Sequence, residues 1–446
     1  MTALAEPVIP AAIPRILRLA SLSPAERDAL MIRRAPDMGR HVEQARPIVE
    51  AVRGEGDRAL VRFAEQFDGV RMSREQLKVA PQDFAGAHRN VPHEVVEAIS
   101  MAADHIRLVH ERQRPATLDM VEVRPGVLAG DRHVPIDSVA CYVPRGKGAF
   151  PSVALMTAIP AVVAGVKKVV IVTPPGPDGH CDPATLVAAR LAGVEDVCLA
   201  GGAQAVAAVA FGTESVPHCV RIVGPGSPWV GAAMTLCSEY IEPGPPAGPS
   251  EAVVFADDTA DVGRVALDLL IEAEHGDDST VFLVTWNNEF AEAVAEAVSG
   301  HLENLSRERR HYARAALGAN GGLVIAGDAG DAIDFVNAFA PEHLQIASRR
   351  PRAWLDAISN AGEILLGQDA PFSMANYMIG VNAVLPTGGK AASRSALGVM
   401  DFLKRQSIAE LTPAGHDTLA PATRILADYE GFDAHALAIS ARRHPS

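Results

Sequence analysis

The sequence predicts an α/β fold with two parallel-sheet domains and small helical segments at both ends of the chain. Short apolar runs alternate with helix-type periods in the middle third, and the same alternation starts again near residue 251. Strands that alternate with helices form right-handed βαβ units and therefore parallel sheets. Aromatic residues make up only 5% of the chain, whereas Ala, Val and Gly are plentiful. This composition suits closely packed α/β layers better than an aromatic-rich β-sandwich.

The amino-terminal part of the chain is predicted to be mostly helical over residues 22–115. Ser23-Pro24-Ala25-Glu26 has the residue types of a helix start. Residues 121–142 have the pattern of short strands. The first alternation then predicts helices at 155–166, 183–194 and 203–212, and strands at 167–175, 195–202 and 220–226.

The second alternation predicts a second set of α/β layers. Its strands are expected at 251–257, 279–286, 321–327, 343–348 and 363–367, and its helices at 260–275, 289–302 and 332–340. After Asp401 the chain is predicted to be helical again. Residues 422–443 are expected to form one closing helix.

Composition and charge exclude several classes of protein. The 446 residues suggest about three domains. The formal charge of −14 argues against a general binder of nucleic acid or anionic membranes, because both need a basic face. A hydrophobic fraction of 48% with 21% charged residues excludes a disordered or fibrous chain.

Cysteine usage and the first residues bear on the compartment. The chain has five cysteines and no C-x-x-C pair, which disfavours both a disulfide framework and a thiolate zinc cage. The first 20 residues lack early basic residues and contain three prolines, so they make a poor signal peptide. No run approaches the roughly 18 uncharged apolar residues of a membrane span. A soluble cytoplasmic protein is expected.

Glycines at predicted strand ends mark a ligand site without identifying its ligand. No strand is followed by the G-x-G-x-x-G pattern that places a pyrophosphate on a helix N-terminus. Gly224-Pro225-Gly226-Ser227 is a fragment of that pattern, and a sharp turn explains it better. Gly201-Gly202 ends another strand, where parallel sheets bind ligands.

Pairs of carboxylates and histidines are candidates for chemistry, each with a plain alternative. Glu272 and His275 share one helix face and could bind one zinc ion, but a histidine in the last turn is also favoured by the helix dipole. Glu342 and His343 could divide acid–base roles, although two polar residues in a surface turn would look the same. Further along, His435 is expected on a solvated C-terminal helix face.

Taken together, the motifs resemble a known family. GGAQA, GTES, IVGPGSPWV, AGPSEAVVFAD, EAEHG, APEHLQIA, NAVLPTGG and DFLKRQSI occur in this order. They resemble the histidinol dehydrogenase family over nearly the whole chain. The resemblance implies oxidation of L-histidinol to L-histidine through an aldehyde, with two NAD+ and one zinc ion per site. It also implies homodimers whose active sites take residues from both chains.

The resemblance assigns roles to individual positions. The implied zinc ligands are Glu272, His275, Asn376 and His435. The implied acid–base pair is Glu342 and His343. The implied substrate-binding positions are Ser250, Glu430, Ala383 and Asn376, and the implied cofactor-binding positions are Tyr142, Gln204 and Ser227. Glu430 and His435 would come from the partner chain.

The same resemblance implies two Rossmann-like parallel-sheet domains without the usual dinucleotide-binding fingerprint. Residues 26–141 and 250–397 would form the first domain, with most of the zinc-binding and catalytic residues. Residues 142–249 would form the second domain, on the NAD side. A helical segment at 1–25 would precede them, and one at 398–446 would reach the partner subunit.

Five positions depart from the family pattern. Glu272 stands where the family has Gln, and Asn376 where it has Asp, so the carboxylate moves between two ligand positions and the set still suits zinc. Ala383 replaces a substrate-contacting His, and alanine has no side-chain donor. Arg145 replaces Gly in the loop after Tyr142, and Ser227 replaces Asn near the cofactor. The side chain of Arg145 would suit a carboxylate, phosphate or sulfonate group of a ligand.

The expected function is therefore a zinc- and NAD-dependent alcohol dehydrogenase. L-histidinol is the first expected substrate. A related amino alcohol, or an anionic diol such as sulfopropanediol, is the alternative within the same class. A catalytically idle paralogue that binds a small ligand is the alternative of another class.

Overall fold

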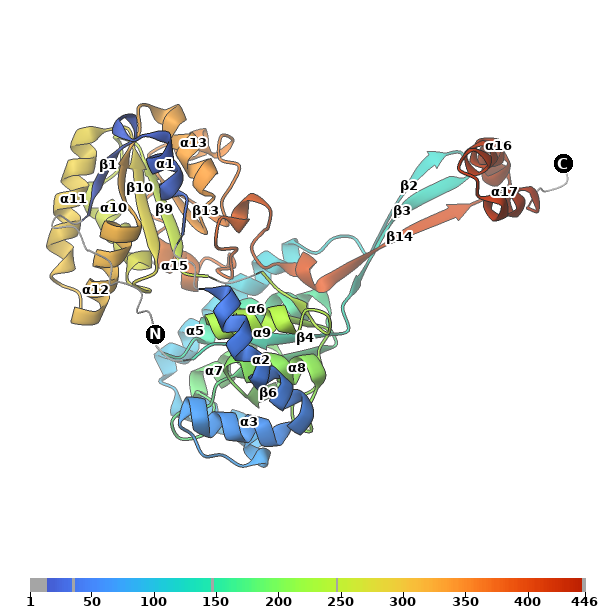
Figure 1. Ribbon diagram of the computed structural model, residues 1–446, viewed down its shortest axis with the longest axis horizontal. Helices are drawn as coiled ribbons and strands as arrows, with labels where there is room; N and C mark the ends of the chain where they lie inside the picture. Colours follow the sequence, from blue (N-terminus) through green and yellow to red (C-terminus); the bar gives the residue numbers. More distant parts are fainter. Residues whose placement is uncertain (1–13, 34–36, 146–147, 246–247, 443–446) are drawn as a thin grey trace.

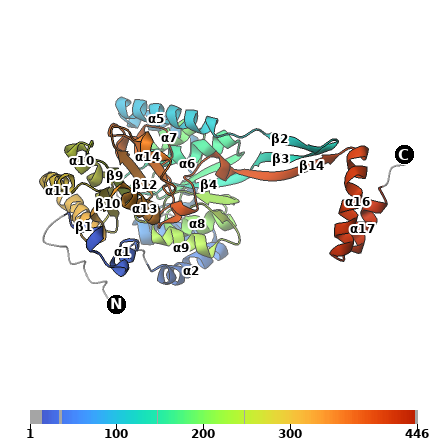
Figure 2. The same ribbon diagram turned by 90° about the horizontal axis from the view of Figure 1, so that it is seen from above.

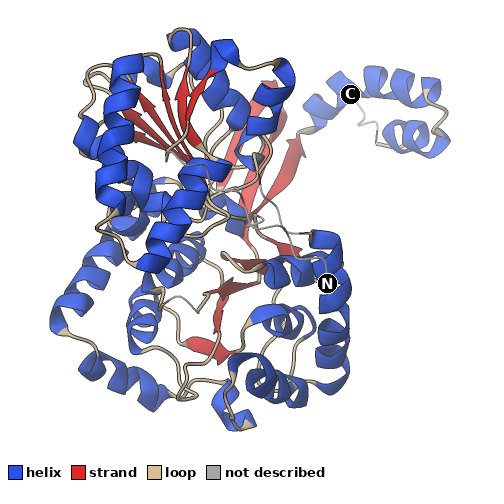
Figure 3. Cartoon of the chain, turned by 60° about the vertical axis from the view of Figure 1, so that its left-hand side comes forward, coloured by secondary structure: helices blue, strands red, loops and turns tan. Residues whose placement is uncertain are grey.

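The computed structural model describes residues 14–33, 37–145, 148–245 and 248–442, so part of the predicted segment at 1–25 lies outside the described residues. The described chain contains a six-stranded, a five-stranded and a three-stranded sheet. Helices cover the two larger sheets, and the third projects away from them (Figures 1 and 3). The predicted α/β fold class is confirmed.

The six-stranded sheet is parallel throughout and has the order β1-β11-β10-β9-β12-β13. Its strands are β1 (Ile16–Arg18), β9 (Glu251–Ala256), β10 (Thr280–Thr285), β11 (Gly322–Ile325), β12 (His343–Ala347) and β13 (Glu363–Leu366). Successive side chains of a strand point to opposite faces. Ala252 and Val254 accordingly pack in the core with α10 (Val262–Ala273) and α11 (Asn288–Leu302). Val253 and Phe255 pack in the core with α13 (Ala329–Phe339) on the other face.

The five-stranded sheet is also parallel, with the order β6-β5-β4-β7-β8. Its strands are β4 (Ser138–Tyr142), β5 (Lys168–Thr173), β6 (Asp196–Leu199), β7 (Arg221–Val223) and β8 (Glu242–Pro243). Its connecting helices are α6 (Pro151–Ala164), α7 (Pro183–Ala192), α8 (Gly202–Phe211) and α9 (Pro228–Leu236). Every strand and helix predicted between residues 155 and 226 is therefore present.

The amino-terminal helices pack on the five-stranded domain. They are α2 (Met38–Glu55), α3 (Asp57–Phe63), α4 (Pro81–Asn90) and α5 (His93–Arg112). Helix α2 lies against α8 and α9, and α5 lies against α6 and α7. This packing differs from the predicted grouping of 26–141 with 250–397. Helical periodicity predicts the apolar face of a helix, but it does not say which sheet that face will cover.

A long arm projects from the body (Figures 1 and 2). Its sheet is antiparallel, with the order β14-β3-β2, formed by β2 (Leu118–Arg124), β3 (Val127–Pro135) and β14 (Leu403–Leu411). Two helices, α16 (Pro413–Tyr429) and α17 (Asp433–Ser440), form its tip. Several apolar side chains of the arm are exposed, among them Val121, Ile425, Tyr429 and Leu437.

Two predictions for the C-terminal part are wrong. Residues 403–411 form strand β14 instead of a helix, because they pair along their whole length with Val127–Pro135, far away in sequence. The single helix expected at 422–443 is instead two helices. Gly431 separates them with a φ of +77°, a left-handed conformation that breaks an α-helix and that glycine adopts without strain.

The other end of the chain partly matches its prediction. Helix α1 (Pro24–Leu30) begins after Ser23, whose side chain accepts from the Glu26 amide in a capping box, as the start signal predicted. Strand β1 was not predicted, and it lies within the segment 1–25 that was expected to be helical. The remaining helices are α12 (Arg307–Ala315), α14 (Arg352–Leu355) and α15 (Phe372–Tyr377). Among the described residues, no helix combines the length and apolarity that crossing a bilayer requires.

Candidate active site

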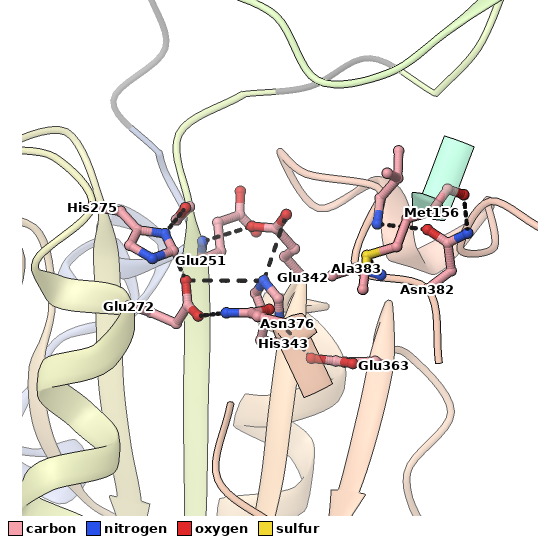
Figure 4. Close-up of polar contacts among 12 residues, drawn as sticks. Met156, Glu251, Glu272, His275, Glu342, His343, Glu363, Asn376, Asn382 and Ala383 are labelled. Carbon is pink, nitrogen blue, oxygen red and sulfur yellow. Dashed lines mark hydrogen bonds and ion pairs between the residues drawn. The ribbon is translucent and has the colours of Figure 1, made fainter. Parts of the chain in front are cut away.

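Charged side chains gather at the amino-terminal edge of the six-stranded sheet (Figure 4). Glu251, His343 and Glu363 are the first residues of β9, β12 and β13, and Glu342 precedes β12. Helix α10 connects β9 to β10, which is parallel to it, so α10 runs back along the sheet and ends at this same edge. It brings Glu272 to the cluster. The site is thus assembled where four elements begin or end.

His343 lies at the centre of this cluster. Its Nδ1 is 2.6 Å from Oε1 of Glu363. Its Nε2 is 3.7 Å from Oε1 of Glu342 and 4.0 Å from Oε2 of Glu272. The ring also meets Phe372 edge-on, with 5.7 Å between the ring centroids. One imidazole therefore contacts three carboxylates in a buried position.

Burial and charge set the protonation of these groups. Burial disfavours the charged form of His343, but the neighbouring carboxylates outweigh it and raise the pKa of His343 to about 10. Burial is also the main reason that the pKa of Glu342 is raised to about 8. Glu272 behaves in the opposite way: burial is outweighed by His343, His275 and Asn376, and its pKa is lowered to about 2. With this raised pKa, His343 keeps a proton on Nε2 at neutral pH, so Nε2 becomes a base only when a cation at Glu272 offsets the negative charge that raises the pKa of His343.

Three of the four predicted zinc ligands converge beside His343. Oε1 of Glu272 accepts a hydrogen bond of 3.0 Å from the Asn376 amide, and its Oε2 is 3.0 Å from His275 Nδ1. Ser250 Oγ lies 3.1 Å from the same His275 nitrogen. A carboxylate, an imidazole and an amide oxygen are donors that zinc accepts, so these residues fit the ion.

The fourth predicted ligand is elsewhere. His435 belongs to α17, and Glu430 follows the last residue of α16. Both helices form the tip of the arm, far from α10 (Figures 1 and 2). In the part of the chain that the structure describes, no three His, Cys, Asp or Glu side chains form a group that could hold a metal. A single chain therefore presents an open set of three donors, one of which is an amide.

The predicted cofactor residues gather at the carboxyl edge of the five-stranded sheet. Tyr142 ends β4, and its hydroxyl oxygen accepts a hydrogen bond of 3.1 Å from the Gly202 amide. Gln204 follows in α8 and is buried. A Cβ at Gly224, which has a φ of +123°, would overlap the Tyr142 carbonyl oxygen. Both glycine turns thus approach Tyr142, and Ser227 begins α9 directly after the second turn.

Ala383 lies in a segment that connects the two domains. Its amide donates to Met156 Sδ of helix α6 at 3.4 Å, and Asn382 donates to the Met156 carbonyl at 2.7 Å (Figure 4). Asn382 also lies 3.3 Å from His110 Nε2. These contacts hold the backbone at Ala383 in place, while the methyl side chain of Ala383 can offer no hydrogen bond to a substrate. Arg145, the other marked departure, lies beside Gly176 after β5.

For two acidic residues of the site, Glu251 and Glu363, the sequence pattern predicts only a place in a strand. Glu363 contacts His343, and the backbone amide of Glu251 donates to Glu342 Oε2 at 3.0 Å. The Glu251 carboxylate pairs with Arg33 at 3.3 Å and is buried. A glutamate at the first position of an otherwise apolar strand is the signal that could have found both.

Comparisons with known proteins agree with this geometry. The sequence profile of the histidinol dehydrogenase family matches residues 32–443. Histidinol dehydrogenase homolog 2 of Mesorhizobium japonicum is 51% identical over 423 residues, which cover 95% of this chain and 96% of that protein. Histidinol dehydrogenase of Synechocystis sp. is 45% identical, covering 96% of this chain and 99% of that protein.

A solved structure extends the agreement to the fold. The crystal structure of histidinol dehydrogenase from Elizabethkingia anophelis superposes with a TM-score of 0.89 at 32% identity, covering 96% of this chain and 97% of that one. The similarity includes both domains and the arm, since so little of either chain is left out. The chain belongs to the histidinol dehydrogenase family of oxidoreductases.

Proposed function

We propose that this protein is a zinc- and NAD-dependent alcohol dehydrogenase that oxidises a primary alcohol through an aldehyde to a carboxylic acid. The observation that carries the proposal is the buried His343, whose Nε2 faces Glu342 and Glu272 beside the open donor set. An acid–base group next to a place for a divalent cation is what oxidation of an alcohol requires. Membership of the family supports the same reaction class.

Glu272, His275 and Asn376 would hold the zinc ion, with His435 of the partner subunit as the fourth ligand. When bound, zinc would lower the pKa of the substrate hydroxyl and offset the negative charge around His343. The exposed apolar side chains of the arm support a homodimer, since a second chain would bury them. The homodimer that the family resemblance implies points the same way.

In the first oxidation, His343 would take the hydroxyl proton on Nε2. NAD+, when bound, would supply the hydride acceptor that turns the alcohol into an aldehyde. Tyr142, Gln204 and Ser227 would position the cofactor from the five-stranded domain. The residues proposed for proton transfer and those proposed for the cofactor thus lie in different domains.

In the second oxidation, Glu342 takes a proton from water as the water adds to the aldehyde carbon. His343 would again accept the hydroxyl proton of the hydrate, and a second NAD+ would supply the acceptor for the second oxidation. The carboxylic acid is released. Burial that raises the pKa of Glu342 to about 8 makes its carboxylate a stronger base than an exposed one.

L-histidinol is the first substrate of the proposal, because the relative from Synechocystis carries that activity in its name. Two residues favour a second candidate, a related amino alcohol or an anionic diol such as sulfopropanediol. Ala383 lacks the side-chain donor that the family pattern has at this position. Arg145 adds a fixed cation in the loop after Tyr142.

The test is a panel of alcohols offered to the zinc-loaded protein with NAD+, followed by NADH absorbance. Turnover of histidinol supports the first candidate, and turnover of other alcohols alone supports the second. His343→Gln protein with normal zinc content is the control for contaminating activity. Absence of turnover on every alcohol would contradict the proposal and leave an idle, ligand-binding relative.

A further inference from the structure

Glu363 and His343 form a buried, hydrogen-bonded pair in the six-stranded sheet. They are the first residues of two neighbouring parallel strands and stand opposite each other in the register of β12 and β13. Their side chains are only 6% and 5% exposed, respectively. The distance of 2.6 Å between Glu363 Oε1 and His343 Nδ1 is that of a strong, charge-assisted hydrogen bond.

Backbone hydrogen bonds hold the starts of strands β12 and β13 together and so fix the positions of Glu363 and His343. The Glu363 amide donates to the Glu342 carbonyl at 3.0 Å, and the Gly362 amide donates to the Pro341 carbonyl at 2.9 Å. A Cβ at Gly362 would lie 2.5 Å from the Glu342 carbonyl oxygen. Glycine at this position therefore allows the starts of β12 and β13 to approach closely enough for the carboxylate to reach the ring.

The chemistry of the two groups determines where the ring proton lies. An ionised carboxylate only accepts hydrogen bonds, so the nitrogen that faces Glu363 must carry a proton. Nδ1 is thereby occupied, and Nε2 is the nitrogen that points toward Glu342 and Glu272. Among the described residues, Glu363 Oε2 is buried without a hydrogen-bond partner. Within the described residues, the hydrogen bond of the Glu363 carboxylate is therefore the one to His343.

We propose that Glu363 is a positioning residue that fixes the ring orientation and the Nδ1-protonated tautomer of His343, leaving Nε2 as the base. The inference rests on the proposed function, in which Nε2 accepts the hydroxyl proton. Glu363 itself touches neither substrate nor cofactor. It acts on the reaction through His343, as a buried carboxylate acts on the histidine of a nucleophile–histidine–carboxylate triad.

The kinetic test compares zinc-loaded wild type with Glu363→Ala, Glu363→Asp and Leu365→Val on an alcohol that the wild type oxidises. Loss of an orienting partner of this kind costs about 10- to 100-fold, so kcat of Glu363→Ala should fall by that factor. KM for the alcohol should stay within about threefold, because substrate contacts are intact. Glu363→Asp should recover part of kcat, because it keeps the carboxylate.

Leu365→Val is the matched control, because Leu365 is buried on the same strand and face, but stands opposite Gln345 in the strand register instead of His343. It should keep nearly the wild-type kcat. Equal losses in Leu365→Val and Glu363→Ala would overturn the proposal, since loosening of the strand would then explain both. An unchanged kcat in Glu363→Ala would overturn it as well.

A second readout needs no turnover. The short buried bond should give a far-downfield imidazole proton resonance in the zinc-loaded protein, coupled to a histidine nitrogen. It should be absent from His343→Gln and Glu363→Ala and present in Leu365→Val. Persistence of the resonance in Glu363→Ala would overturn the inference. If the resonance behaves as expected while wild type oxidises no alcohol, the proposed function fails and the pair stands.

Discussion

At the amino-terminal edge of the six-stranded sheet, carboxylates and imidazoles from several elements crowd around His343. At the carboxyl-terminal edge of the five-stranded sheet, glycine turns approach the uncharged Tyr142 and Gln204. In open parallel sheets ligands usually bind at the carboxyl ends of the strands. The second edge follows that rule, whereas the first does not. The comparison shows that the residues proposed for proton transfer and those proposed for cofactor binding lie at opposite ends of two similar sheets.

The difference has a physical cause. A glycine turn leaves backbone amides free to approach a phosphate, and needs no charge of its own. Proton transfer needs titratable side chains in a buried place, and these stay charged only beside opposite charges or a cation. Glu272 meets that condition through His343 and His275. The different compositions of the two edges thus fit the different tasks proposed for them.

Removing the base should have the largest effect and should separate the two edges. His343→Gln should lower alcohol oxidation by about a hundredfold or more, because the proposed base is lost and the other imidazole of the cluster, His275, is assigned to zinc. Binding of NAD+, measured by calorimetry, should be unchanged, since Tyr142 and its glycine turns are untouched. A variant that oxidises alcohol at half the wild-type rate would contradict the role given to His343.

The neighbouring carboxyl group should affect mainly the second oxidation. Glu342→Gln should still reduce NAD+ with supplied alcohol at a residual rate, but should oxidise supplied aldehyde about a hundredfold more slowly than wild type. The reason is that only the second step needs a proton taken from water. Rapid-mixing measurement of NADH with each substrate distinguishes the steps. Equal losses on alcohol and aldehyde would show that Glu342 has no separate role in hydration.

A change at the other edge should act on the cofactor alone. Gly224→Ala would push a methyl group into the Tyr142 carbonyl and strain a φ of +123°, so KM for NAD+ should rise by about tenfold or more. Zinc content should stay normal. Gly69→Ala is the control, because Gly69 also has a positive φ, of +70°, but open space around it. A loss of zinc in Gly224→Ala would mean that the two edges are not independent.

The segment between the edges should give the smallest effect, a change of substrate preference. Ala383→His restores the donor of the family pattern and should raise kcat/KM for histidinol about tenfold, the scale on which a site rewards a new hydrogen bond to substrate. Thermal unfolding should show that the Asn382 and Met156 contacts survive. If wild type already oxidises histidinol with micromolar KM, Ala383 is a neutral replacement.

The fold was predictable wherever local pattern decides it. Most strands and helices between residues 155 and 367 follow from apolar periodicity, because each of them buries its own apolar face, whereas β8, α9, α12 and α14 were not predicted. Strand β14 was not predictable in this way. Its residues are largely exposed and polar, and they form a strand only because β3 offers a partner over the full register. The residues of β14 alone carry no signal for pairing with a strand so distant in the sequence.

The site was predictable in part for a similar reason. Adjacent Glu342 and His343 stand out as a polar pair between apolar runs, and the resemblance supplied their roles. Glu363 did not stand out, because its partnership with His343 is created by strand register and not by spacing in the sequence. The position of His435 on the arm follows from the fold, whereas its proposed contact with a second chain lies beyond any pattern within one chain.

The zinc content of purified protein tests the account most directly, because the open set of donors at the amino-terminal edge is complete only if a partner's arm supplies His435. Wild type should hold about one zinc ion per chain. His435→Ala should lose most of the zinc while remaining folded, and His311→Ala, an exposed histidine of α12, should lose none. Full zinc occupancy in His435→Ala, or none in wild type, would contradict the ligand set and the shared site.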